Sequence, residues 1–182
     1  MRFMTVSPHS MLEFITARDH RLMRRVHNWR APRWIRLWMI VATRGGDGWL
    51  WYFTIFVILL FGGRDRFAAA AGAVVATSVG IAIFLVLKRS TGRKRPCALE
   101  PHCWAQLLPP DQFSFPSGHS ITAFAMAMVV GLFYPALMSV LLFCAISIAA
   151  SRIILGMHFL SDVVVGSGIG ATIGYLAYVI YA

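Results

Sequence analysis

Residues 120–151 read "SITAFAMAMVVGLFYPALMSVLLFCAISIAAS", a stretch of 32 residues without a charged side chain. About 20 apolar residues are enough for a helix to cross the hydrocarbon core of a bilayer, so this stretch is too long for one crossing. Tyr134 and Pro135 lie near its middle, and proline interrupts a helix. We therefore predict two membrane helices joined by a tight turn at this dipeptide.

Other charge-free stretches predict further membrane crossings. They cover residues 48–63, 67–87 and 163–182, which together with the pair above makes five crossings. Several are nearer 15 residues than 20, so we expect helices that extend into the loops or a locally thinner bilayer. A sixth candidate, "WIRLWMIVAT" at residues 34–43, is shorter and contains Arg36. It is either a short span or half of a half-inserted hairpin that turns at "RGGDG" (44–48).

The composition agrees with a membrane protein. Hydrophobic residues make up 58% of the chain and charged residues 13%, against about 45–50% and 25% in soluble domains. The length of 182 residues suits one domain, and no linker or internal repeat is visible. We predict an all-α integral membrane bundle of five to six transmembrane helices, with a single transmembrane domain at residues 34–182.

The N-terminal segment, residues 1–33, differs from the rest because it is basic. Its apolar residues recur at helical spacing, which predicts an amphipathic helix on the membrane surface. The early residues lack the continuous apolar core of a signal peptide. We expect its arginines to attract anionic lipid headgroups rather than nucleic acid, so the formal charge of +10 needs no other partner. The apolar positions are Leu12, Ile15, Leu22, Met23 and Val26.

The polar groups near the apolar stretches gather at one membrane face. Lys88 follows the stretch at 67–87, and "PSGH" (116–119) opens the next helix. Arg152 closes the helix after that, and His158 and Asp162 begin the last one. An ionisable group near the hydrocarbon is costly and usually functional. Since alternate helix ends meet at the same face, we predict that three separated segments converge on one polar cluster.

The chemistry of this cluster suits a phosphate. Lys88, Arg95 and Arg152 are cations that can bind the oxygens of a dianionic phosphate. His158 and Asp162 are four residues apart and hence share a helix face. The carboxylate can then hydrogen-bond one ring nitrogen and leave the other free to attack.

Residues 117–119 add an anion site and a proton donor. Ser117 and Gly118 stand at a helix start, where free N–H groups favour an anion and glycine permits close approach. His119 can act as a general acid. Each polar residue alone has an ordinary explanation, as an interfacial cation, a helix-end histidine or an N-cap serine. No structural need explains the whole set, which predicts a phosphoryl-transfer site.

Three motifs carry a resemblance to a known family. "KRSTGRKRP" (88–96), "PSGH" (116–119) and "SRIILGMHFLSD" (151–162) resemble the signature motifs of the type 2 phosphatidic acid phosphatase superfamily. That superfamily also includes glucose-6-phosphatase and the vanadium haloperoxidases. All three motifs occur in order with unbroken spacing, although together they span less than half of the chain. The resemblance implies an integral membrane lipid phosphatase.

The resemblance also implies a role for each matching residue. His158 would attack phosphorus and form a phosphohistidine, Asp162 would orient it, and His119 would protonate the leaving oxygen and then help to activate water. No metal or other cofactor is implied, and vanadate is expected to inhibit as a transition-state mimic. The phosphoryl oxygens would be held by Lys88, Arg95, Ser117, Gly118 and Arg152.

Several residues outside the motifs carry weaker expectations. "TRGGDG" (43–48) resembles a Gly-Asp-Gly turn of bacterial members, so we expect Asp47 to have a structural role rather than a catalytic one. Cys97 and Cys103 either form a disulfide or stay reduced, and Cys144 is expected to pack within a helix. Small residues suit close helix packing, expected within the chain, at Gly166, Gly170 and Gly174.

The side of the membrane depends on the sixth candidate span. Eight arginines lie between residues 2 and 36. If residues 34–43 cross the membrane, the positive-inside rule places the N-terminus in the cytoplasm and the site at the periplasmic face of a bacterial inner membrane. If residues 34–43 do not cross, the same rule places the site at the cytoplasmic face instead. We expect the periplasmic face.

The substrate is expected to be amphiphilic, because the site lies where helices meet lipid headgroups. Undecaprenyl pyrophosphate is placed slightly ahead of phosphatidylglycerol phosphate, phosphatidic acid and lipid A 1-phosphate. Phosphate transfer to another lipid and a non-catalytic lipid-phosphate carrier are the alternatives. The carrier is disfavoured because His119, His158 and Asp162 are all present. No oligomeric state is predicted.

Overall fold

The computed structural model describes residues 8–29, 31–99 and 112–182. Within these ranges the regular structure is helical, apart from one isolated bridge between Lys94 and Phe113. The helices are α1 (Pro8–Asn28), α2 (Arg33–Gly46), α3 (Trp49–Phe61), α4 (Arg66–Thr91), the short α5 (Pro96–Leu99), α6 (Gly118–Phe133), α7 (Met138–Ile154) and α8 (Leu160–Tyr181), with 3-10 turns η1 (Gly63–Asp65) and η2 (Pro135–Leu137).

The predicted break at Tyr134 is confirmed. Helix α6 ends at Phe133, and α7 begins after the turn η2. Pro135 has no backbone N–H to donate, so it cannot continue α6, whereas it fits the first position of a new turn. The Tyr134 hydroxyl donates to the Gly62 carbonyl at 2.9 Å, which ties this turn to the end of α3.

The all-α membrane architecture is confirmed. Among the described residues, three helical stretches are long and apolar enough to cross a membrane, at Gly63–Thr91, Pro135–Ile154 and Leu160–Tyr181, and Gly118–Phe133 is a shorter apolar helix. Helix α4 extends past the apolar stretch as far as Thr91, as expected of a short span that uses its loops. The five predicted crossings correspond to α3, α4, α6, α7 and α8, and that number stays a prediction.

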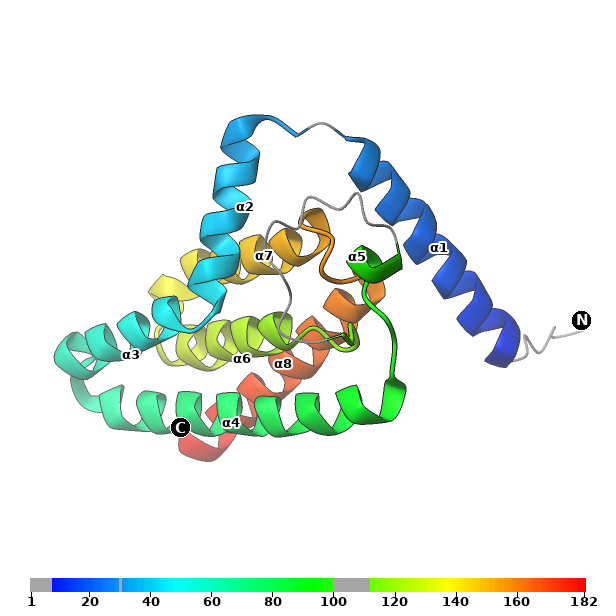
Figure 1. Cartoon of the computed structure of the whole chain (residues 1–182). Helices are drawn as coiled ribbons and strands as arrows, with labels where there is room; N and C mark the ends of the chain where they lie inside the picture. The colour runs from blue at the N-terminus through cyan, green and yellow to red at the C-terminus, as the bar shows by residue number, and fades with distance from the viewer. Residues whose placement is uncertain (1–7, 30, 100–111) are drawn as a thin grey trace, which may run out of the picture.

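Helix α2 does not run with the bundle. In Figure 1 it lies across the direction of α3, α4, α6 and α7. Its residues Ile35 and Met39 pack with Leu155 and Met157, which lie between α7 and α8. The turn that follows α2 reaches the start of α6 through Asp47. Whether residues 34–43 form a short span or half of a half-inserted hairpin stays a prediction.

The centre of the bundle is α6, which packs against α4, α7 and α8. Small residues on α8 allow the closest of these contacts, because a Cβ atom there would meet a backbone carbonyl oxygen of Ser117, Ile121 or Ala125. The expectation of close packing within the chain is confirmed. The small residues concerned are Gly166, Gly170 and Gly174.

Helix α1 lies outside the bundle, beside the ends of α7 and α8 that are near α5 (Figure 1). Its amphipathic character is confirmed in outline, since Met23 is buried, Leu22 and Val26 are half-buried and the arginines at positions 18, 21, 24 and 25 are exposed. Ile15 is exposed, against the pattern.

The cysteines have different outcomes. Cys144 is half-buried and packs against the core, as expected. Cys103 lies outside the described residues, so its pairing with Cys97 stays a prediction.

Candidate active site

The start of α6 is held in place by its capping serine. Ser117 is fully buried, and its Oγ accepts hydrogen bonds from Ser120 N at 3.4 Å and from Ser120 Oγ at 2.9 Å. The Ser117 N–H donates to the Asp162 carbonyl at 3.1 Å. This N-cap therefore anchors the first turn of α6 to the first turn of α8. The N–H groups in the first turn of α6 point outward from the start of that helix.

A cavity of about 320 Å³ opens beside this helix start. It brings together Arg95 from the segment after α4, His119 from α6 and His158 from the segment between α7 and α8. The three segments predicted to converge therefore meet in one place. The cavity is lined by Gly46, Asp47, Gly80, Ile81, Phe84, Arg95, Gly118, His119, Thr122 and His158.

The two ring nitrogens of His158 have different partners. Nδ1 lies 2.6 Å from the Ser114 carbonyl oxygen, and Arg95 Nη1 lies 3.1 Å from Nε2. A carbonyl can only accept, so Nδ1 carries the proton and Nε2 presents its lone pair. Burial lowers the pKa of His158 to about 4, and the positive charges of Arg152 and Arg95 act in the same direction. His158 is therefore a neutral imidazole at physiological pH.

Asp162 is fully buried beside this imidazole. Its Oδ2 accepts from the Phe159 N–H at 2.8 Å and lies 3.8 Å from His158 Nδ1. Its Oδ1 accepts from Arg93 Nη1 at 2.6 Å. The direct hydrogen bond expected between His158 and Asp162 is thus made to Ser114 instead, and the carboxylate acts on the imidazole through its charge.

His119 has an acidic partner that the sequence did not identify. Its Nε2 lies 2.8 Å from Asp47 Oδ1. Asp47 follows α2 in the glycine-rich turn, where Gly48 has a φ of 123°, a conformation that favours glycine. A Cβ atom at Gly46 would lie 2.9 Å from the His119 ring. The expected structural role of the turn holds, but the turn also places a carboxylate in the cavity wall.

The three predicted phosphate-binding cations occupy different positions. Arg95 and Arg152 are each 4% exposed. Arg95 Nη1 also donates to the Met157 carbonyl at 2.9 Å, and Arg152 Nη1 donates to Thr43 Oγ1. Lys88 is half-buried, and its Nζ lies 4.5 Å from the centroid of the Phe84 ring, which lines the cavity. Arg95 is thus the predicted cation that lines the cavity directly.

Arg93 is a second residue that sequence reasoning missed. It lies in the same basic motif as Lys88 and Arg95. Its place among the cations of that motif is the only signal in the sequence, and that signal does not set Arg93 apart from the others. Its bond to Asp162 makes it the cation next to the carboxylate behind His158. In residues 8–29, 31–99 and 112–182, no group of three or more His, Cys, Asp and Glu side chains is arranged to hold a metal ion.

Sequence comparisons agree with the resemblance of the three motifs. A family model described as the PAP2 superfamily matches residues 67–182. A decaprenylphosphoryl-5-phosphoribose phosphatase of Mycobacterium tuberculosis is 37% identical over 111 residues, which cover 61% of this chain and 58% of that protein. A lipid A 1-phosphatase of Rhizobium johnstonii is 29% identical over 158 residues, which cover 76% and 64%. The chain therefore spans less than two thirds of the length of either relative.

Solved structures show the same fold. A transmembrane PAP2-type phosphatidylglycerolphosphate phosphatase of Bacillus subtilis superimposes with a TM-score of 0.74 at 23% identity, covering 92% of this chain and 86% of that one. LpxE of Aquifex aeolicus superimposes with a TM-score of 0.69 at 26% identity, covering 86% and 92%. Both likenesses extend well beyond the motifs, which occupy less than half of the sequence.

Proposed function

Because this chain belongs to the PAP2 superfamily, we propose that it is an integral membrane phosphatase that hydrolyses a phosphate monoester or pyrophosphate on a lipid. The observation that carries the proposal is the cavity in which the Nε2 lone pair of His158, the guanidinium of Arg95 and the imidazole of His119 meet. A nucleophile, an anion-binding cation and a proton donor are the groups that phosphoryl transfer requires.

The first half of the reaction would form a phosphohistidine. Nε2 of His158 attacks phosphorus, and the bond from phosphorus to the lipid oxygen breaks. His119 donates a proton to that departing oxygen. The imidazole becomes positively charged as the new bond forms, and the Asp162 carboxylate, 3.8 Å from Nδ1, stabilises that charge.

The second half would reverse these roles. Water attacks the phosphohistidine, His119 takes the proton from the water, and inorganic phosphate leaves as His158 is regenerated. The carboxylate of Asp47, 2.8 Å from His119 Nε2, holds the ring in place in both steps. The negative charge of a bound phosphate favours the protonated imidazole that the first step needs.

Arg95 would change partner when substrate binds. In the structure it donates to the His158 lone pair that has to attack. A phosphoryl oxygen is a stronger, charged acceptor, so it would draw the guanidinium away from Nε2. We propose that Arg152, Lys88, Ser117 and the N–H of Gly118 bind the remaining phosphoryl oxygens.

A second cavity, of about 300 Å³, supports an amphiphilic substrate. It shares the lining residues Gly46, Asp47, Ile81 and Thr122 with the first cavity, so the two cavities are adjacent. Its other lining residues come from the turn before α3 and from α3, α4 and α6, and they are mostly apolar. An acyl or prenyl chain could lie there with its headgroup at His158. The lining residues that the second cavity does not share with the first are Gly48, Trp51, Tyr52, Ile55, Ala73, Val74, Thr77 and Met126.

Among lipids, we place polyprenyl phosphates first. The mycobacterial relative is named for a decaprenylphosphoryl substrate, which supports a prenyl carrier such as undecaprenyl pyrophosphate. Lipid A 1-phosphate follows, because a second relative is named for it. Phosphatidylglycerol phosphate and phosphatidic acid complete the candidates.

The test is phosphate release from these four lipids by the purified chain in detergent. We expect one lipid to be hydrolysed fastest, and His158→Ala to lose activity on the order of 1000-fold or more, since the covalent route is then absent. Equal release by wild type and His158→Ala would remove the proposal.

Two inhibitors test the proposed chemistry in the same assay. We expect vanadate to inhibit, because it adopts the geometry of the transferring phosphoryl group. We expect activity to persist in a chelator. Full loss of turnover on chelation, restored by a divalent metal, would contradict a metal-independent mechanism.

A further inference from the structure

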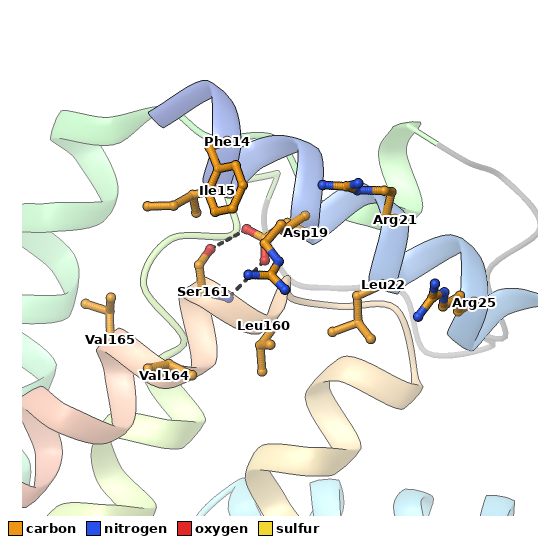
Figure 2. A pocket seen from close by; sticks show the side chains of 11 residues that line it. Phe14, Ile15, Asp19, Arg21, Leu22, Arg25, Leu160, Ser161, Val164 and Val165 are labelled. Atoms are coloured by element: carbon orange, nitrogen blue, oxygen red, sulfur yellow. Dashed lines mark hydrogen bonds between the residues drawn. The ribbon is translucent and has the colours of Figure 1, made fainter. Parts of the chain in front are cut away.

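Helix α1 contributes one buried acid to the rest of the protein. Asp19 is 5% exposed, although the arginines around it on α1 are exposed. Its carboxylate accepts from Ser161 N at 3.2 Å, from Ser161 Oγ at 2.5 Å and from Arg93 Nη2 at 2.7 Å. Figure 2 shows Asp19 pointing from α1 to Ser161 in the first turn of α8.

Arg93 joins this acid to the carboxylate of the site. Its Nη2 donates to Asp19, while its Nη1 donates to Asp162 Oδ1 at 2.6 Å and to Ser161 Oγ at 2.7 Å. The guanidinium also lies 4.3 Å from the centroid of the Phe159 ring. A guanidinium held at both ends of its fork and on its face has little freedom to move.

The surroundings of Asp162 explain why the fixed position of the Arg93 guanidinium matters. A buried carboxylate is costly unless it is paired and hydrogen-bonded. Asp162 meets both needs with the Phe159 N–H on Oδ2 and Arg93 on Oδ1, and these two bonds set the direction of the carboxylate. That carboxylate lies 3.8 Å from the imidazole nitrogen opposite the attacking atom.

We propose that Asp19 and Arg93 are positioning residues, which hold the Asp162 carboxylate behind His158, so that docking of α1 completes the active site. Neither lines the cavity, so they act through Asp162 and not on the substrate. The inference rests on the proposed function of His158 as the nucleophile. It gives α1, which lies outside the residues matched by the family model, a role in the reaction beyond attachment to the membrane.

The first test measures kcat and KM of the full-length chain for the panel lipid that the wild type hydrolyses fastest. We expect kcat to fall in Arg93→Gln by about 10- to 100-fold, as when an outer group that orients a reacting residue is removed. Asp19→Asn keeps the shape of the side chain but not its charge, and we expect a smaller fall. KM should stay within about twofold in both, because binding contacts are untouched.

Two exposed residues of α1 provide matched controls. Glu13→Gln makes the same chemical change as Asp19→Asn, and Arg24→Gln the same change as Arg93→Gln. We expect both controls to keep the wild-type kcat. Equal losses in the controls would overturn the proposal, because they would show a general effect of charge on α1.

A double variant tests whether Asp19 acts through Arg93. If it does, Asp19→Asn with Arg93→Gln should be no slower than Arg93→Gln alone. Multiplying losses would overturn that link, as would a raised KM with unchanged kcat, which would place Arg93 in substrate binding. Unchanged kcat in both single variants would overturn the whole inference.

Two further variants guard against misfolding, which thermal melting of each protein would reveal. Ser161→Ala removes the hydroxyl that Asp19 and Arg93 share but keeps both charges, and Arg93→Lys keeps the cation. We expect each to show a smaller loss of kcat than Arg93→Gln, and a wild-type kcat in Ser161→Ala would count against the network. His158→Ala is measured in parallel: if it is active, the proposed function fails, whereas an inactive His158→Ala beside fully active Arg93→Gln defeats only this inference.

Discussion

The His158 imidazole meets a different kind of partner at each nitrogen. The Ser114 carbonyl fixes the proton on Nδ1, and Arg95 donates to Nε2. Burial of the ring, with the positive charges of Arg152 and Arg95 acting in the same direction, lowers the pKa of His158, so the ring stays neutral and nucleophilic. The sequence pattern showed which histidine could attack, because an acid follows it by four residues. It did not show that a backbone carbonyl would select the tautomer.

Acidification should destabilise the protein through His158. Histidine in an unfolded chain titrates near pH 6.5, whereas the folded pKa is about 4, so between these values the unfolded state binds more protons and stability falls as the pH falls. The shift corresponds to roughly 2–4 kcal/mol. We expect the melting temperature of wild type to fall more than that of His158→Gln between pH 7 and pH 4.5 in detergent. Equal falls in the melting temperatures of wild type and His158→Gln would contradict a lowered pKa of His158 in the folded protein.

Asp47 offers a second test at the scale of a residue. Its carboxylate orients His119, so we expect Asp47→Asn to lower kcat by about 10- to 100-fold, less than the loss of a general acid itself. Asp65→Asn, an exposed acid in the turn η1, is the matched control and should leave kcat unchanged. A normal kcat in Asp47→Asn would return the turn to the purely structural role first expected.

At the scale of the helix, the packing of α6 on α8 depends on which glycine faces the neighbour. The three glycines at 166, 170 and 174 recur every four residues and so share one face of α8. Periodicity alone predicted close packing along this stripe. It could not name the partner helix, because a stripe of small residues fits another chain as well as α6.

Two neighbouring glycines test this contact. A Cβ atom at Gly170 would overlap the Ile121 backbone, whereas a Cβ atom at Gly168 would meet nothing within 4 Å. We expect Gly170→Ala to destabilise the protein by about 1–3 kcal/mol or more and to lower its melting temperature. Gly168→Ala should be neutral or slightly stabilising, since alanine favours a helix. Equal melting temperatures of Gly170→Ala and Gly168→Ala would contradict a close contact between α8 and α6 at Gly170.

At the scale of the whole molecule, the placement of α1 bears on the membrane orientation, which stays a prediction. Asp19 of α1 binds Arg93 and Ser161, so α1 and its arginines lie at the same face as the site. The periplasmic expectation required residues 34–43 to carry the chain to the other face, and α2 lies across the bundle instead (Figure 1). If α2 does not cross the membrane, the positive-inside rule places the site at the cytoplasmic face, which is a prediction that labelling can test.

Cysteine labelling in intact cells tests this orientation. In a variant with its own cysteines replaced, we expect Arg89→Cys, exposed at the end of α4 near the site, to be protected from an impermeant maleimide until lysis. Arg64→Cys, exposed in η1 at the opposite end of α4, should be labelled before lysis. The reverse pattern would restore the periplasmic assignment.

The sequence by itself determined the membrane class, the break at Tyr134 and the set of polar groups that share a face. Hydropathy, proline and spacing are local properties, and each acts within a few residues of its own position. Only the tertiary structure decided the partners of those groups: Ser114 for His158, Asp47 for His119, Arg93 for Asp162, and Asp19 for Arg93 in turn. All of these contacts join residues that are 44 to 74 positions apart in the sequence. Their geometry depends on how the helices pack, which no local pattern records.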